Sequence, residues 1–150
     1  MKWLISYCAI LLAALMVPVE RADVAQLRPI EVICIYKDAD MVILKTDTDD
    51  IGIGHDALSA LENMKLTSPA MIYLDTAEYL LIGPGAQEDA KQLKGVLKNS
   101  VQLCETDTNI KLKDAAQYLP VHGDLPDFKG WEAGEKLPVL SLHNDRIKIS

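Results

Sequence analysis

Residues 30–46 read I-E-V-I-C-I-Y-K-D-A-D-M-V-I-L-K-T, and this stretch decides the fold class. Two β-branched, apolar runs, 30–36 and 41–46, flank the polar tetrapeptide K-D-A-D, which is the pattern of a β-hairpin. Apolar residues occupy both faces of each run. We therefore expect two central strands that are covered on both sides, with Val32 and Ile43 fully buried.

Helical patterns follow the hairpin. Residues 56–66 carry apolar side chains at helical spacing, and Ser68-Pro69 ends that pattern. A second, longer helix is predicted from residue 86 to residue 104. Its apolar stripe consists of Ala90, Leu93, Leu97, Val101 and Cys104.

The remaining segments are short strands and loops. Further strands are predicted at 70–74 and 78–82, a weak one within 111–121, and two around an Asn-Asp turn in 139–150. Residues 46–55 and the Gly- and Pro-rich residues 122–138 are expected to be loops. The predicted fold class is α/β (α+β), a single domain with a mixed β-sheet and two main helices.

Length and charge limit the classes of function. The chain has 150 residues, enough for one domain with a real core, and its formal net charge is −7. Lysines and arginines are scattered without a cluster. Both observations argue against nucleic acid and anionic membrane surfaces as partners.

The N-terminal segment, residues 1–22, resembles a secretory signal. Lys2 precedes an apolar run from 3 to 17, which is short for a membrane span of roughly 20 residues. Glu20 is unfavourable for cleavage after Ala22, so an uncleaved N-terminal anchor stays open, as does a buried helix. Cys8 lies inside the run and is badly placed for lipid attachment. We expect an exported protein, secreted or on the outer face of the cytoplasmic membrane, with one domain over 23–150.

Two cysteines remain beyond this segment. Cys34 and Cys104 would be able to pair in an oxidising compartment. Cys34 lies in an apolar run, where cysteine behaves as a small hydrophobe, and we favour two buried free thiols.

The stretch G83-P-G85-A-Q-E88 has the layout of a phosphate-binding turn without its chemistry. Glu replaces the third glycine of the dinucleotide fingerprint, and no Gly-Lys-Ser/Thr follows. Glu88 and Asp89 suit the positive end of a helix dipole and would repel a phosphate there. We predict a helix cap, and no nucleotide.

Metal and catalytic patterns are weak. T46-D-T-D-D-I-G52 resembles a calcium loop, but Ile51 and Leu58 occupy the fifth and twelfth ligand positions. A solvated acidic turn is favoured. The three histidines, His55, His122 and His143, lack metal-pair spacing, and no nucleophile elbow is present. We assign no catalytic residue, no cofactor and no metal, and expect that the protein is not an enzyme.

Phe128 and Trp131 lie among Gly, Pro and acidic residues. Aromatic side chains in loops often carry binding energy, so these two are candidate partner contacts if at least one ring is exposed. The alternative is that both rings fold back as a local cluster that caps the domain.

One resemblance covers residues 28–150. After the hairpin, G-I-G-H-D-A-L-S-A-L-E-N and S-P-A-M-I-Y-L-D-T-A-E-Y-L-L-I-G-P-G-A-Q-E-D are similar to the N-terminal domain of the Ger(x)C family, the C subunits of spore germinant receptors. The family's usual cysteine directly after the signal is absent, Leu74-Asp75 stands where the family often has Gly-His, and its members are more than twice this length. The chain therefore looks like either a shortened relative with a changed partner or a receptor subunit.

This resemblance implies an accessory role outside the cytoplasmic membrane, with membrane-protein receptor subunits as partners and no known catalytic centre. The expected function is a non-catalytic extracytoplasmic binding or assembly module, linked to spore germination. Membrane contact would occur only through an uncleaved N-terminal segment. The alternative is a small secreted hydrolase with an unrecognised active site.

Overall fold

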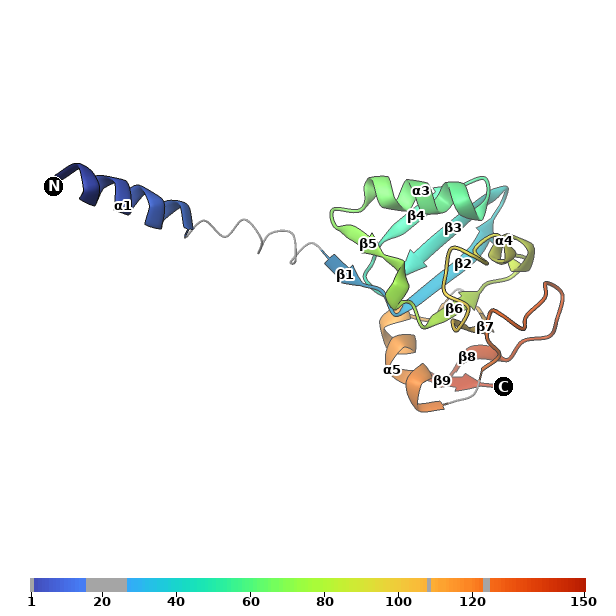
Figure 1. Ribbon diagram of the computed structural model, residues 1–150. Coiled ribbons are helices and arrows are strands. Elements are labelled where there is room, and N and C mark those ends of the chain that lie inside the picture. Colours follow the sequence, from blue (N-terminus) through green and yellow to red (C-terminus); the bar gives the residue numbers. More distant parts are fainter. Residues whose placement is uncertain (1, 16–26, 108, 123–124) are drawn as a thin grey trace.

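The computed structural model describes residues 2–15, 27–107, 109–122 and 125–150 (Figure 1). Its main feature is a mixed seven-stranded sheet with the strand order β4-β3-β2-β6-β7-β8-β9. Strands β2, β6, β7 and β8 run parallel to their neighbours in that series, whereas β3, β4 and β9 pair in antiparallel fashion. The predicted fold class, one mixed α/β domain, is confirmed. The sheet consists of β2 (Val32–Asp38), β3 (Met41–Thr46), β4 (Ile51–Gly54), β6 (Tyr79–Ile82), β7 (Gln102–Thr106), β8 (Val139–His143) and β9 (Arg146–Ile149).

Helices cover both faces of this sheet. Helices α3 (Ala57–Thr67) and α4 (Gln87–Lys91) lie on one face, and their buried residues join the larger hydrophobic core. Helix α5 (Leu112–His122) lies on the opposite face and buries Ala115 and Leu119 in a smaller core (Figure 1). An additional N-terminal helix, α1 (Lys2–Leu15), precedes the domain.

The hairpin of β2 and β3 forms as predicted, with Ile35 opposite Leu44. Val32 is fully buried, but Ile43 is only half-buried, so the prediction of full burial is wrong for Ile43. Helix α5 packs against β2 and β9, and it leaves the Ile43 side of β3 without a covering helix. The expectation of two covered faces therefore holds for β2 alone.

Strand β4 lies inside the segment that we expected to be a loop. Its two glycines, Gly52 and Gly54, permit close contact with α3, because a Cβ at Gly52 would stand 2.1 Å from the carbonyl oxygen of Ala60. Glycine inside a strand often marks a close approach of another backbone, which sequence pattern alone does not distinguish from a loop.

The predicted long helix from 86 to 104 is wrong. Helix α4 ends at Lys91, Gly95 adopts a φ of +95°, and the chain returns as β7. Leu93, Leu97 and Val101 are buried in the larger core, whereas Cys104 belongs to the smaller one. An apolar spacing of three to four residues therefore arose from turns and a strand rather than from one helix.

The weak strand predicted within 111–121 is also wrong, because these residues form α5. The other short elements agree better with expectation. Strand β6 and the β8–β9 hairpin form, and Asn144 and Asp145 both have positive φ values, 50° and 61°, as a type I′ turn requires. Strand β5 (Met71–Tyr73) pairs with β1 (Leu27–Pro29) in a separate two-stranded sheet, and the short 3-10 helix η1 (Leu74–Thr76) follows it.

Candidate functional site

The G83-P-G85 turn lines a cleft of about 580 Å³ where β6 and β7 end. The Gln87 side chain spans this cleft, because it donates a hydrogen bond to Glu105 and accepts one from the Gly134 amide at 2.8 Å. Three carboxylates line the cleft, from Glu88, Glu105 and Asp107. Among the described residues that line the cleft there is no lysine or arginine, so this lining is unsuited to a phosphate group.

The two acidic residues of α4 have different surroundings. Glu88 is exposed, whereas Asp89 is buried and lies 3.4 Å from the Lys37 ammonium. We expected both carboxylates to act through the helix dipole. Because α4 has only five residues and Lys37 stands beside Asp89, the ion pair with β2 gives Asp89 a tertiary role as well.

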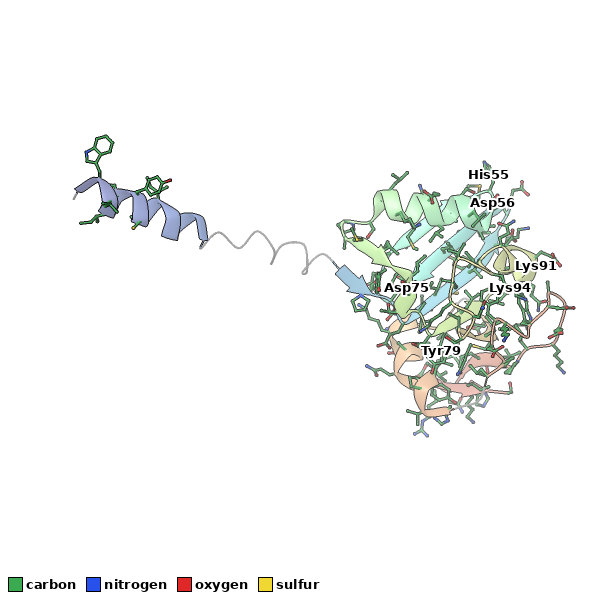
Figure 2. All side chains as sticks on the ribbon, in the orientation of Figure 1. His55, Asp56, Asp75, Tyr79, Lys91 and Lys94 are labelled. Atoms are coloured by element: carbon green, nitrogen blue, oxygen red, sulfur yellow. The ribbon has the colours of Figure 1, made fainter. Side chains whose placement is uncertain are left out.

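Lysines after α4 bind other segments of the domain. Lys94 donates to the Trp131 carbonyl at 3.1 Å, and Lys98 pairs with Glu78 at 2.6 Å. In the view of Figure 2, Lys91 and Lys94 are toward the right of the domain and Asp75 is toward the left.

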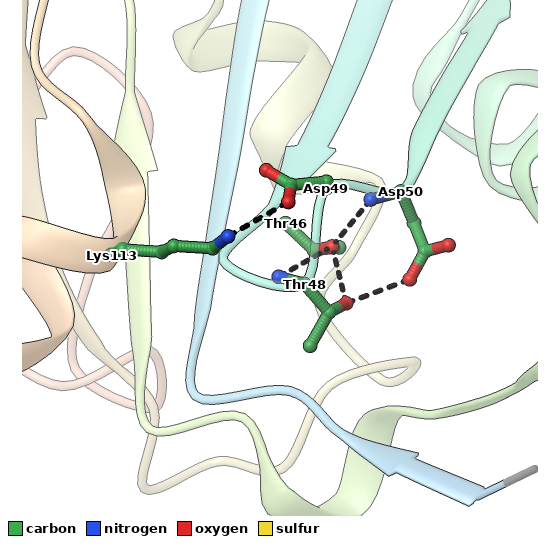
Figure 3. A network of polar contacts seen from close by, with 5 residues as sticks. All are labelled: Thr46, Thr48, Asp49, Asp50 and Lys113. Carbon is green, nitrogen blue, oxygen red and sulfur yellow. Dashed lines mark hydrogen bonds and ion pairs between the residues drawn. The ribbon is translucent and has the colours of Figure 1, made fainter.

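The calcium-like turn is held by its own hydrogen bonds (Figure 3). The Thr46 hydroxyl accepts from the amides of Thr48 and Asp50, and Thr48 donates to Asp50 Oδ2 at 2.7 Å. Asp47 accepts from the amides of Glu31 and Val32 at the start of β2. The carboxylates of Asp47 and Asp50 thus accept hydrogen bonds from groups of the domain itself.

One contact joins this turn to the opposite layer. Asp49 has a φ of +65° and accepts a hydrogen bond from Lys113 of α5 at 2.9 Å (Figure 3). The same hydrogen bond raises the pKa of Lys113. Since both side chains are exposed, we assign this ion pair to positioning of α5 with a small energetic effect.

The histidines lie on separate elements. His55 precedes Asp56, the N-cap of α3 (Figure 2), whose carboxylate accepts from the Ser59 amide at 2.7 Å. Hydrogen bonds from Ser59 lower the pKa of Asp56. His143 ends β8 and His122 ends α5. In the described part of the chain, no three His, Cys, Asp or Glu side chains are arranged to hold a metal ion.

The aromatic pair proposed as a partner contact is inside the domain. Phe128 and Trp131 are 0% and 1% exposed, and their ring centroids are 5.9 Å apart. The interpretation with an exposed ring is wrong, and the alternative, in which both rings fold back into the domain, is confirmed. Both side chains belong to the larger core. The 125–138 segment folds back over the sheet there, and it supplies apolar surface to the core that the short helix α4 does not supply.

A groove of about 480 Å³ lies between α5 and the β8–β9 hairpin, and we call it the α5–hairpin groove. Tyr118 and His122 stack along it, with ring centroids 4.0 Å apart and an interplanar angle of 19°. Apolar side chains beside the rings are exposed, at 76% for Val121 and 43% for Leu142. The lining residues are Asp114, Gln117, Tyr118, Val121, His122, Leu142, Asp145, Arg146 and Ile147.

This composition resembles that of protein contact surfaces. Tyr and Arg are enriched among residues that dominate binding energy, and exposed apolar side chains gain free energy when a partner covers them. Sequence reasoning missed the groove because 111–121 was interpreted as a strand. The spacing of Leu112, Ala115, Ala116 and Leu119 is helical and would have placed Tyr118 and His122 one turn apart.

No protein-family model, curated protein or solved structure was found to match this chain. Among the described residues, no helix has both the length and the apolar character that crossing a membrane demands.

Proposed function

We propose that this protein is a non-catalytic binding module that acts on the outer side of the cytoplasmic membrane and contacts a partner protein through the α5–hairpin groove. The observation that carries the binding function is the stacked Tyr118–His122 pair beside exposed Val121 and Leu142. An amphipathic ring pair, exposed aliphatic groups and an arginine on one rigid helix–hairpin frame form a preorganised protein-binding surface.

Export is the second part of the proposal, and α1 supports it. Its apolar side chains are exposed, including Trp3 at 91% and both Leu4 and Ile5 at 71%. Leaving such side chains in water forgoes about 1.5–3 kcal/mol each, so an apolar environment is favoured. The 14 residues of α1 span about 21 Å, which suits the apolar core of an export signal.

Site-specific photo-crosslinking in cells tests the binding function. A photoreactive amino acid at Leu142 or Val121 should give one adduct of defined mass, whereas the same group at the exposed Glu62 of α3 should not. Adducts that appear equally from Glu62, or from none of these positions, would contradict binding through the groove.

A reporter fusion tests export separately. Residues 1–30 joined to an enzyme that is active only outside the cytoplasm should yield activity. A matched fusion with Leu4→Lys and Ile10→Lys should not, because two charges interrupt the apolar run. Equal reporter activity in both fusions would contradict the proposed export and would not affect the proposal that the α5–hairpin groove binds a partner.

The resemblance of residues 28–150 to the Ger(x)C domain implies a specific setting, in which the partner is a membrane-protein subunit of a germinant receptor. If that setting is right, the crosslinked protein identified by mass spectrometry should be an integral membrane protein. A soluble partner would remove the germination version of the proposal and leave the binding function in place.

A further inference from the structure

Strand β9 is an open edge of the sheet. Val139 and Ser150 exchange two backbone hydrogen bonds of 3.0 Å, and bonded pairs alternate with non-bonded pairs along an antiparallel ladder. The pairs Leu140–Ile149 and Leu142–Ile147 are therefore non-bonded. The N–H and C=O groups of Ile147 and Ile149 consequently point away from β8, and no described strand pairs with them.

The opposite edge of the sheet, β4, is partly closed by α3. At β4, the Asn63 side chain of α3 accepts from the Ile53 amide at 3.0 Å, and the Thr67 hydroxyl donates to the Ile51 carbonyl at 3.4 Å. Helix α3 thus satisfies two of the outward groups of β4, one N–H and one C=O. It shields part of one edge of the sheet from strand pairing, whereas no described strand covers the other edge.

The open edge carries positive charge on an acidic protein. Arg146 and Lys148 are both exposed, and they alternate with Ile147 and Ile149, whose side chains pack against the smaller core. The whole chain has a net charge of −7, so this strand is a local exception. Lysine on an edge strand commonly opposes pairing, and two copies of β9 side by side would place like charges together.

An acidic strand reverses that repulsion. Side chains on successive positions of an added strand would alternate between the Arg146–Lys148 side and the side that holds the α5–hairpin groove. The groove adjoins the edge, because Arg146 and Ile147 belong to its lining. An added strand therefore meets cations on one side and, on the other side, the end of the α5–hairpin groove that Ile147 lines.

We propose that β9 binds an extended segment of a partner protein by strand addition, and that this segment alternates acidic and apolar residues. The inference rests on the proposed binding function and specifies the partner of that same site. Main-chain hydrogen bonds to Ile147 and Ile149 would hold the strand, and its carboxylates would pair with Arg146 and Lys148.

A designed peptide supplies the probe. A dye-labelled peptide of eight residues that alternates glutamate with valine or leucine is titrated with the full chain and followed by fluorescence anisotropy. We expect saturable binding that weakens as salt is raised, and an affinity at least about tenfold lower for the peptide with lysine in place of glutamate. Equal binding of both peptides would contradict the proposal.

Variants of the edge locate the binding. Ile149→Pro removes an N–H that points outward and spares the β8 ladder, so it should lower the affinity at least about tenfold. The matched control Ile149→Ala keeps that N–H and should retain affinity within about threefold. Arg146→Glu with Lys148→Glu changes exposed side chains and should abolish binding of the glutamate peptide, whether or not Ile149→Pro folds.

Amide hydrogen exchange gives an independent measure. The Ile147 and Ile149 amides should exchange fast in the free protein and become protected with the glutamate peptide, whereas the Ile53 amide should not change. Wild-type affinity for the glutamate peptide in the Arg146→Glu, Lys148→Glu variant would overturn the proposal. A dimer of the wild-type protein that disappears with Ile149→Pro would also overturn it, because a second copy of the chain would then occupy the edge. Groove crosslinks without peptide binding would leave the binding function standing and overturn the acidic strand alone.

Discussion

Cys34 and Cys104 face the same side of the sheet with Leu81 between them, because the register aligns Cys34 with Leu81 and Leu81 with Cys104. Two strand spacings separate the thiols, or about 10 Å between their Cα atoms. A disulfide requires Cα atoms less than roughly 7 Å apart. Both cysteines are free and buried, as the apolar context of Cys34 indicated.

These thiols should make stability fall at alkaline pH. Burial raises the pKa of Cys34 and of Cys104 to about 12, above the ordinary value near 9. The unfolded chain therefore loses these protons at a lower pH than the folded chain does. The contribution of the two buried, neutral thiols to the free energy of unfolding is complete below about pH 9 and is lost progressively between about pH 9 and pH 12. Urea unfolding from pH 7 to pH 11 should show this decline.

The double variant Cys34→Ala with Cys104→Ala is the control, and its decline over the same range should be smaller. In a Cys8→Ser background, a thiol reagent should label the protein only after unfolding. Rapid labelling of the folded protein would show that the two thiols are accessible and would contradict their burial.

Truncation of the hairpin should distinguish its two strands. Val32→Ala should cost about 1.5–3 kcal/mol of the free energy of unfolding, because the side chain is fully buried on central β2. Ile43→Val removes one methylene, whereas Val32→Ala removes two carbon atoms. The Ile43→Val change should cost less than about 0.5–1 kcal/mol, because less is removed and Ile43 is only half-buried. Chemical denaturation measures both, and a larger loss at Ile43 would mean that its side of β3 is covered.

Gly52 should not accept a side chain. A Cβ there would stand 2.1 Å from the Ala60 carbonyl oxygen and 2.6 Å from Met64 Cβ, so α3 would have to move off β4. We expect Gly52→Ala to destabilise the domain by about 1–3 kcal/mol. Gly134→Ala is not a matched control because its φ is +98°, but Gly130→Ala is, since its nearest contact is 3.5 Å away. Equal stability of the two variants would contradict the close packing of α3.

Trp131 should report a buried environment. In a Trp3→Phe background it is the single tryptophan, and it is 1% exposed beside Phe128. We expect blue-shifted emission that iodide hardly quenches, and a loss of about 3–5 kcal/mol on Phe128→Ala. Strong quenching in the folded protein would show that the Trp131 ring is exposed, and would make Trp131 a candidate partner contact again.

The sequence by itself determined the elements whose signals are local. The apolar, β-branched hairpin of 30–46, the Asp56-to-Ser68 helix boundaries and the Asn144-Asp145 turn all depend on side-chain preferences within a few residues. Fold class followed from these elements, because a twice-covered strand such as β2 requires layers on both faces of a sheet.

Only the tertiary structure decided which apolar spacing was helical and which aromatic residues were buried. Leu93, Leu97 and Val101 match a helical stripe, yet Gly95 and the pairing of β7 with β6 divide them between turns and a strand. Phe128 and Trp131 lie in a Gly- and Pro-rich loop that closes the larger core. The open edge at β9 depends on strand order, and strand order depends on contacts between segments far apart in the chain, which local sequence preferences do not encode.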